Sequence, residues 1–169
     1  MLQCVARAEV FGSGSKPGIV NTITVVSPGN TASNQLLLRG SNRSPFLHLE
    51  IALDYTVAFL PGDSTEEPYQ ARVTTYLYAI NDLFGRELFA YHWHPQGVSH
   101  VKTPHLHFNG ADPMRLPVRP ESPQVTDLSL SRSHFPARPI ELSELIHFLI
   151  RDLAVEPRRP DWERVLEER

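Results

Sequence analysis

The pattern of apolar and polar residues is clearest in the middle of the chain. Between Leu47 and Phe59 every second residue is apolar, and the intervening residues are polar or small. A period of two predicts a long, half-buried β-strand, because alternate side chains of a strand point to opposite faces of a sheet. Three further segments, each bounded by turn-forming residues, are predicted as strands: 70–80, 86–94 and 103–108. The pattern therefore predicts an antiparallel meander of at least four strands.

The period changes near the C-terminus. Between residues 140 and 153 the apolar residues recur three or four positions apart, which predicts an amphipathic helix with one apolar stripe. This stripe consists of Leu142, Leu145, Ile146, Leu149 and Leu153. A short second helix is expected after Pro160. The predicted fold class is α+β, a mostly antiparallel β-sheet in a meander with the C-terminal helix packed on one face.

The domain organisation follows from where these patterns begin. Residues 1–44 are rich in Gly, Ser and Asn, and they predict an irregular or flexible N-terminal extension with weaker strand patterns at 19–26 and 35–39. Residues 45–169 are predicted to form a single α+β domain. Within this domain, residues 109–126 contain four prolines and predict an extended connection.

Composition narrows the class of protein. The chain has 169 residues, 41% of them hydrophobic, and its apolar runs are too short to span a bilayer. The N-terminus has no basic start followed by an apolar stretch, which argues against a secretory signal. The single cysteine, Cys4, excludes an internal disulfide. We therefore expect a cytoplasmic protein without a membrane partner, and the net charge of −3 argues against a protein that coats nucleic acid.

Histidines concentrate in one short stretch. Five of the eight lie within sixteen residues, at positions His92, His94, His100, His105 and His107. Each His-x-His pair falls in a predicted strand, so both of its imidazoles point to one face while the intervening aromatic or apolar residue points to the other. If the two strands are antiparallel neighbours, four imidazoles form a patch on one face of the sheet.

Three interpretations of this patch follow from the chemistry of imidazole. In the first, the imidazoles bind zinc or another divalent transition metal, as the strand His-x-His of cupins does. The ligands would be His92, His94, His105 and His107. In the second, no metal or other cofactor is needed, and two imidazoles transfer protons during RNA cleavage while a cation such as Lys102 stabilises the transition state. In the third, the protein is a non-catalytic interaction domain whose partner covers the patch.

Four motifs follow one another between Leu47 and Glu168. They are Tyr76-Leu77-Tyr78, the aromatic strand from Phe89 to Trp93, Pro104-His105-Leu106-His107, and the segment from His134 to Arg138 before the apolar helix. This order resembles a family of small bacterial proteins related to toxins that are encoded beside helix-turn-helix antitoxins. The resemblance implies a toxin-like protein that acts on RNA or a nucleotide and that binds an antitoxin protein.

The leading hypothesis joins this resemblance to the local chemistry. It is a toxin–antitoxin-type toxin that works as a metal-independent ribonuclease or nucleotide-directed enzyme. The resemblance implies a phosphate-binding role for Arg138 and catalytic roles for His92, His105, His107 and His134. The local chemistry makes His105 and His107 the groups that transfer protons, and it adds Lys102 and His94 as substrate-binding residues.

Overall fold

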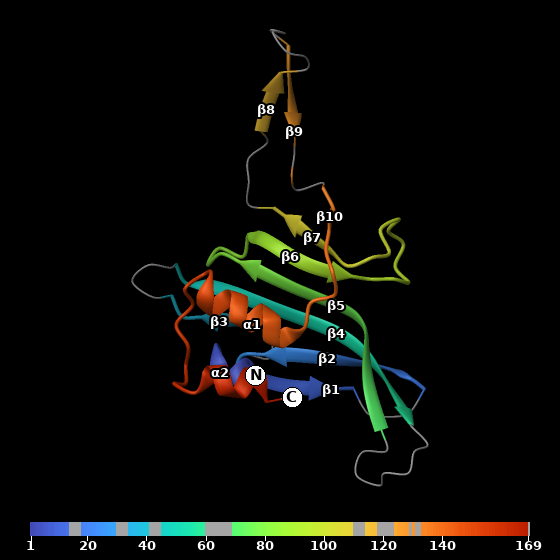
Figure 1. Ribbon diagram of the computed structural model, residues 1–169, viewed down its shortest axis with the longest axis vertical. Coiled ribbons are helices and arrows are strands. Elements are labelled where there is room, and N and C mark those ends of the chain that lie inside the picture. Colours follow the sequence, from blue (N-terminus) through green and yellow to red (C-terminus); the bar gives the residue numbers. More distant parts are fainter. Residues whose placement is uncertain are drawn as a thin grey trace.

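The computed structural model describes residues 1–13, 18–29, 34–40, 45–59, 69–109, 114–117, 124–128, 130 and 133–168. Its centre is one antiparallel sheet with the strand order β1-β2-β4-β5-β6-β7-β10, in which β3 also pairs with β4 (Figure 1). The bounds of these strands are β1 Glu9–Gly12, β2 Val20–Val26, β3 Gln35–Leu38, β4 Leu47–Phe59, β5 Tyr69–Asn81, β6 Glu87–Trp93, β7 His105–Phe108 and β10 Phe135–Pro136. The predicted antiparallel meander is therefore confirmed.

Strand β4 organises the sheet because it is long enough to pair with three neighbours. Along one edge it pairs with β5, and along the other it pairs with β2 and β3 in succession. The alternation predicted for this segment is realised, since Leu49 and Ile51 are buried while the side chains between them are only partly buried. The long strand thereby holds the N-terminal strands and the histidine-bearing half of the molecule in one sheet.

One face of the sheet is covered by helix α1 (Leu142–Arg151), as Figure 1 shows. The predicted apolar stripe is confirmed, because Leu145, Ile146 and Leu149 are fully buried in a common core with the strand residues. A capping box between Glu141 and Glu144 starts the helix by satisfying free backbone N–H groups. The fold is therefore α+β, with the C-terminal helix on one face.

Helix α2 (Trp162–Glu167) follows α1 and buries Leu166. Its first turn is tied to α1 by contact of the His147 and Trp162 rings, whose centroids lie 5.3 Å apart, and by a salt bridge of 3.1 Å between Arg151 and Glu163. Among the described residues, no helix has the length and apolar character needed to cross a membrane.

The N-terminal segment is more regular than the sequence predicted. Residues 1–44 were expected to form an irregular or flexible extension, but their described parts contribute the 3₁₀ turn Leu2–Cys4 and strands β1, β2 and β3. Cys4, Val5 and Leu36 are fully buried in the core. Strands β2 and β3 coincide with the weak patterns at 19–26 and 35–39, and both are held in the sheet by pairing with β4, whereas β1 pairs with β2.

The proline-rich connection also contains regular structure. Within residues 109–126, predicted to be an extended connection, strand β8 (Met114–Pro117) pairs with β9 (Val125–Leu128) as a separate two-stranded sheet. This hairpin projects away from the main sheet at the top of Figure 1. Proline at the last position of β8 is compatible with strand structure, because an end position need not donate a ladder hydrogen bond.

The packing of β3 leads to a stability prediction. Leu36 is fully buried, whereas its neighbour Leu37 is 47% exposed on the opposite face. We expect Leu36→Ala to lower the free energy of unfolding by about 2–5 kcal/mol, because it leaves a cavity in the core. The matched control Leu37→Ala should change it by less than about 0.5 kcal/mol. Urea denaturation measures both, and equally small losses would show that β3 does not pack in the core.

Candidate functional site

Strand pairing brings the predicted histidines onto one face of the sheet. In the β6–β7 pair His92 stands opposite His105, and Ala90 stands opposite His107. Strand β10 pairs with β7 through Phe135 and Leu106, so the alternation places His134, just before β10, on the face of His107. This face is the one opposite helix α1.

The rings lie close together. The ring centroid of His107 lies 4.7 Å from that of His92, 4.9 Å from that of His105 and 4.5 Å from that of His134. One imidazole nitrogen from each of His92, His105 and His107 lies within 4.8 Å of the other two. His94 lies at the margin, with its ring centroid 5.6 Å from that of His92. We call His92, His105, His107 and His134 the histidine cluster.

Hydrogen bonding defines the free nitrogen of His105. Its Nδ1 lies 2.8 Å from the carbonyl oxygen of Thr103. A carbonyl oxygen can only accept, so Nδ1 carries the proton and donates it, and Nε2 keeps a free lone pair. Among the described residues, the Nε2 atom of His92 is buried without a hydrogen-bond partner. The cluster therefore contains buried imidazole nitrogens that are available as ligands.

Burial favours the neutral form of two of these imidazoles, those of His92 and His107. The pKa of His92 falls to about 4, first because burial penalises the charged form and then because His107 and three further imidazoles lie close by. The pKa of His107 is lowered by burial and by the nearby His134 and His105. Neutral imidazole is the form that binds metal ions and accepts protons, so both activities are open to the cluster near pH 7.

The donor set fits a transition metal. Imidazole nitrogens suit zinc, iron, nickel and copper, whereas calcium and magnesium prefer oxygen ligands. A tetrahedral ion with metal–nitrogen bonds of about 2.0–2.1 Å holds its ligand atoms about 3.3 Å apart. The nitrogens of His92, His105 and His107 lie within 4.8 Å of one another, so they would have to approach somewhat to bind one ion.

A hollow of about 490 Å³, with both polar and apolar side chains in its lining, lies beside His94 on the same face of the sheet. Its lining includes Asp54, whose carboxylate accepts hydrogen bonds from the hydroxyl groups of Thr22 at 2.7 Å and Thr75 at 3.0 Å. Sequence reasoning did not select Asp54 as a site residue. The only signal for it was its polar position in the alternating pattern of residues 47–59, which placed it on the outer face without a partner.

The two cations predicted to bind phosphate differ in position. The ammonium group of Lys102 donates to the carbonyl oxygen of Gly97, which lines the hollow beside His94. The guanidinium group of Arg138 binds both carboxylate oxygens of Glu144 on helix α1, at 3.1 and 2.5 Å. The structure therefore holds Arg138 on the helix side of the sheet, away from the histidine cluster.

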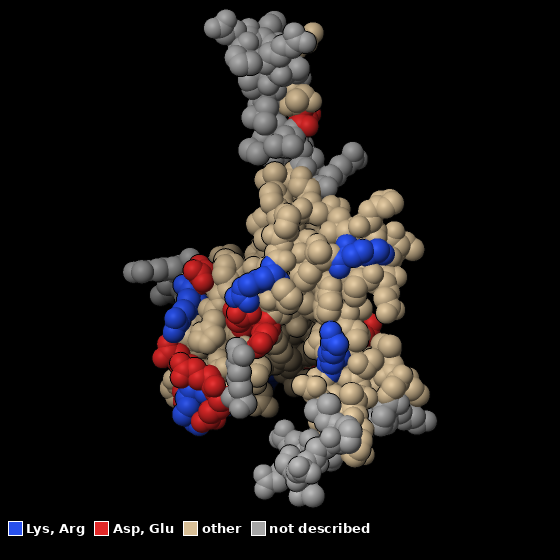
Figure 2. All heavy atoms as spheres, turned by 45° about the vertical axis from the view of Figure 1, so that its right-hand side comes forward, with Lys and Arg blue, Asp and Glu red and all other residues tan. Residues whose placement is uncertain are grey.

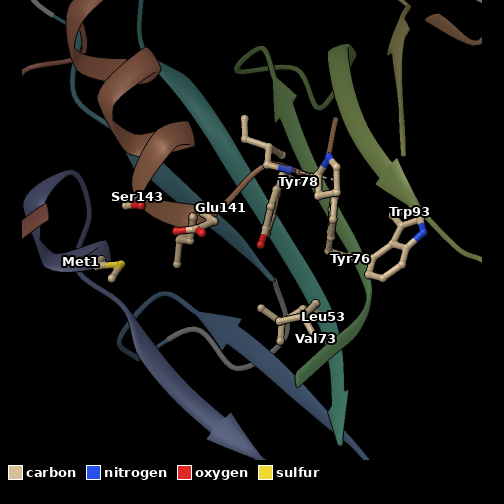
Figure 3. Close-up of a pocket in the computed structure, with 11 residues that line it drawn as sticks. Met1, Leu53, Val73, Tyr76, Tyr78, Trp93, Glu141 and Ser143 are labelled. Atoms are coloured by element: carbon tan, nitrogen blue, oxygen red, sulfur yellow. Dashed lines mark hydrogen bonds between the residues drawn. The ribbon is translucent and has the colours of Figure 1, made fainter. Parts of the chain in front are cut away.

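Trp93 also points away from the histidines. It lines an apolar hollow of about 410 Å³ at the start of helix α1, together with Tyr76 and Tyr78 (Figure 3). Burial, followed by the nearby Tyr76 hydroxyl and Glu141 carboxylate, raises the pKa of Tyr78 to about 12. The aromatic residues between the histidines therefore serve packing on the helix face.

Charged side chains are interspersed on the face shown in Figure 2. Lysine and arginine are separated by uncharged surface, and several lie against aspartate or glutamate. Most of the ion pairs formed by described residues lie in the C-terminal segment, for example Arg164 with Asp161 and Glu168. On this face, positive charge is therefore not gathered into one broad patch (Figure 2).

The lowered pKa of His92 predicts how stability depends on pH. Between about 6.5, the ordinary value, and about 4, the unfolded chain binds more protons than the folded chain, so acidification favours unfolding. We expect the metal-free protein to lose stability in this window and His92→Gln to reduce the slope. The exposed His100 provides the control, since His100→Gln should leave the slope unchanged. Urea denaturation at a series of pH values measures this, and equal slopes in the two variants would contradict it.

Known proteins give no direct guide to this site. No family model, no curated protein and no solved structure matches the chain. The resemblance to toxin-related proteins therefore stays a prediction, and interpretation of the site depends on the geometry of the histidine cluster itself.

Proposed function

We propose that the protein binds a divalent transition-metal ion through His92, His105 and His107. The observation that carries the proposal is that one imidazole nitrogen from each residue lies within 4.8 Å of the other two. Three ligands on two paired strands are held by the backbone ladder, so their spacing is set by the sheet and not by a loop. This corresponds to the metal-binding alternative in the sequence analysis, with three of the four predicted ligands retained and His94 left out.

The surroundings of the three residues support this function. A metal-ligating histidine commonly donates its second ring N–H to a carbonyl group, as His105 does to Thr103. His92 offers a buried nitrogen without a hydrogen-bond partner among the described residues. Burying unpaired imidazole nitrogens costs free energy, and coordination of an ion would recover it.

The ligand set also determines the chemistry that the ion could perform. Three neutral nitrogen ligands leave the double positive charge of the ion uncompensated and leave a coordination position open, as in catalytic zinc sites. Such an ion can polarise a bound water molecule or a phosphate ester for hydrolysis. The hollow of about 490 Å³ beside His94 provides room for a substrate on the same face. We therefore propose metal-assisted hydrolysis as the activity.

Metal-independent cleavage of RNA or a nucleotide is the second candidate. The ring centroids of His107 and His134 lie 4.5 Å apart, and one ring is half-buried while the other is exposed. Two imidazoles in different surroundings can act as a base and an acid. In this second candidate function, the protein would also bind an antitoxin protein as its partner. It is the weaker proposal because Arg138, its predicted phosphate-binding residue, is engaged by Glu144.

Metal analysis of protein purified without a histidine tag tests the first proposal. We expect about one equivalent of zinc, cobalt or another divalent transition metal per chain. Replacement of a direct ligand should cost more than the roughly 10–100-fold loss typical of a residue that only orients a ligand. His92→Ala, His105→Ala and His107→Ala should therefore each weaken cobalt binding more than about 100-fold, as followed by the visible spectrum of the cobalt protein.

His48→Ala is the matched control, because His48 is a half-buried histidine on β4, outside the cluster. It should leave cobalt binding unchanged. If wild-type protein binds no metal while chelator-treated protein cleaves RNA and His107→Ala abolishes cleavage, the first proposal is wrong and the second is correct. Equal losses in His48→Ala and His107→Ala would also contradict the proposed site.

A further inference from the structure

Another hollow, of about 470 Å³ and distinct from the two described above, lies near strand β3 and the N-terminal segment. Three arginines from three distant parts of the sequence line it, Arg7, Arg39 and Arg158. Ser27, Leu37 and Phe46 contribute to the same lining. Neither the predicted function nor the proposed metal site uses these residues.

Backbone hydrogen bonds fix the three segments relative to one another. The N–H of Arg158 donates to the carbonyl oxygen of Cys4 at 2.7 Å, and the N–H of Glu156 donates to that of Arg39 at 2.9 Å. A β-bridge joins Gly40 to Val155. Because Cys4 and Val155 are fully buried, the backbone around the hollow is anchored in the core. The position of the hollow is therefore fixed by the folded backbone.

The positive charges of the three guanidinium groups are not paired with carboxylates of the described residues. Among the described residues, five other arginines form salt bridges with carboxylates, at positions Arg86, Arg138, Arg151, Arg159 and Arg164. Within the residues that the structure describes, no salt bridge or side-chain hydrogen bond involves Arg7, Arg39 or Arg158. Guanidinium groups stay charged at all physiological pH values, so three of them around one hollow favour a multiply charged anion.

The remaining lining indicates what the anion is attached to. Leu37 and Phe46 are each 47% exposed, which leaves an aliphatic and an aromatic surface next to the arginines. An aromatic ring can stack on a nucleobase, and guanidinium groups match phosphate oxygens in geometry and charge. An inorganic anion would use only the arginines and leave both apolar side chains in water.

This hollow is separate from the histidine cluster. Strand β3 lies on one edge of β4, whereas the cluster begins at β6, and the full width of β5 lies between β4 and β6. Three positive charges suit a ligand with about three negative charges, such as a nucleoside diphosphate at neutral pH. We propose that the hollow formed by Arg7, Arg39 and Arg158 binds a nucleotide, with its phosphates on the guanidinium groups and its base against Phe46.

Calorimetric titration of the full chain with ADP, inorganic pyrophosphate and adenosine tests this proposal. We expect ADP to bind more tightly than pyrophosphate, and adenosine to bind weakly. Arg39→Gln and Arg158→Gln should each weaken ADP binding at least about tenfold, because each removes a charged hydrogen bond. Phe46→Ala should weaken ADP binding but leave pyrophosphate binding unchanged.

Arg151→Gln is the matched control, because Arg151 is exposed, pairs with Glu163 and does not line the hollow. It should leave ADP binding unchanged. Arg39→Lys retains the charge but not the forked donor geometry, and it should give an intermediate loss in a folded protein. His107→Ala should bind ADP normally, so failure of the metal proposal would not affect this test.

Three results would overturn the proposal. The first is no detectable binding of ADP by the wild-type chain. The second is ADP binding that Arg151→Gln weakens as much as Arg39→Gln does. The third is equal affinity for ADP and pyrophosphate with no effect of Phe46→Ala, which would leave a phosphate site without nucleotide recognition.

Discussion

The antiparallel pairing of β6 with β7, with His92 opposite His105, is the constraint on which the histidine cluster and the packing of the β6 aromatic rings against the core both depend. The same register places Tyr91 opposite Leu106 on the helix face. A slip of one residue would move every side chain to the other face, so that imidazoles would lie under helix α1 and aromatic rings in water. Each displaced aromatic ring would lose burial worth on the order of 2–3 kcal/mol, which selects the observed register.

The register also brings the imidazoles close together, and this favours the neutral form of His92 and His107. Rings whose centroids lie 4.5–5.0 Å apart, such as those of His107 with His134 and with His105, would repel one another if protonated. Burial acts in the same direction, and together these effects lower the pKa of His92 and His107. A metal ion would replace repulsion with attraction, since each neutral nitrogen would then face a positive charge.

The arginines divide into two groups with different physical roles. Those of the C-terminal segment, such as Arg159 and Arg164 around Asp161, form partly or fully exposed pairs that add little stability but neutralise charge locally. Those around the hollow near β3 line it without a carboxylate among the described lining residues. The fold tolerates this arrangement because backbone bonds to buried segments hold the arginines there, independently of their side chains.

By itself, the sequence determined the fold class, the long alternating strand at 47–59, the helical stripe from Leu142 and the separation of imidazoles from aromatics on β6 and β7. These features follow from local periodicity, which one segment carries without reference to any other. Only the tertiary structure decided that residues 1–44 join the core, that Glu144 holds Arg138 away from the histidine cluster, and that Arg7, Arg39 and Arg158 meet around one hollow. The reason is that strand partners and ion pairs depend on which distant segments meet, and spacing along the chain does not contain that information.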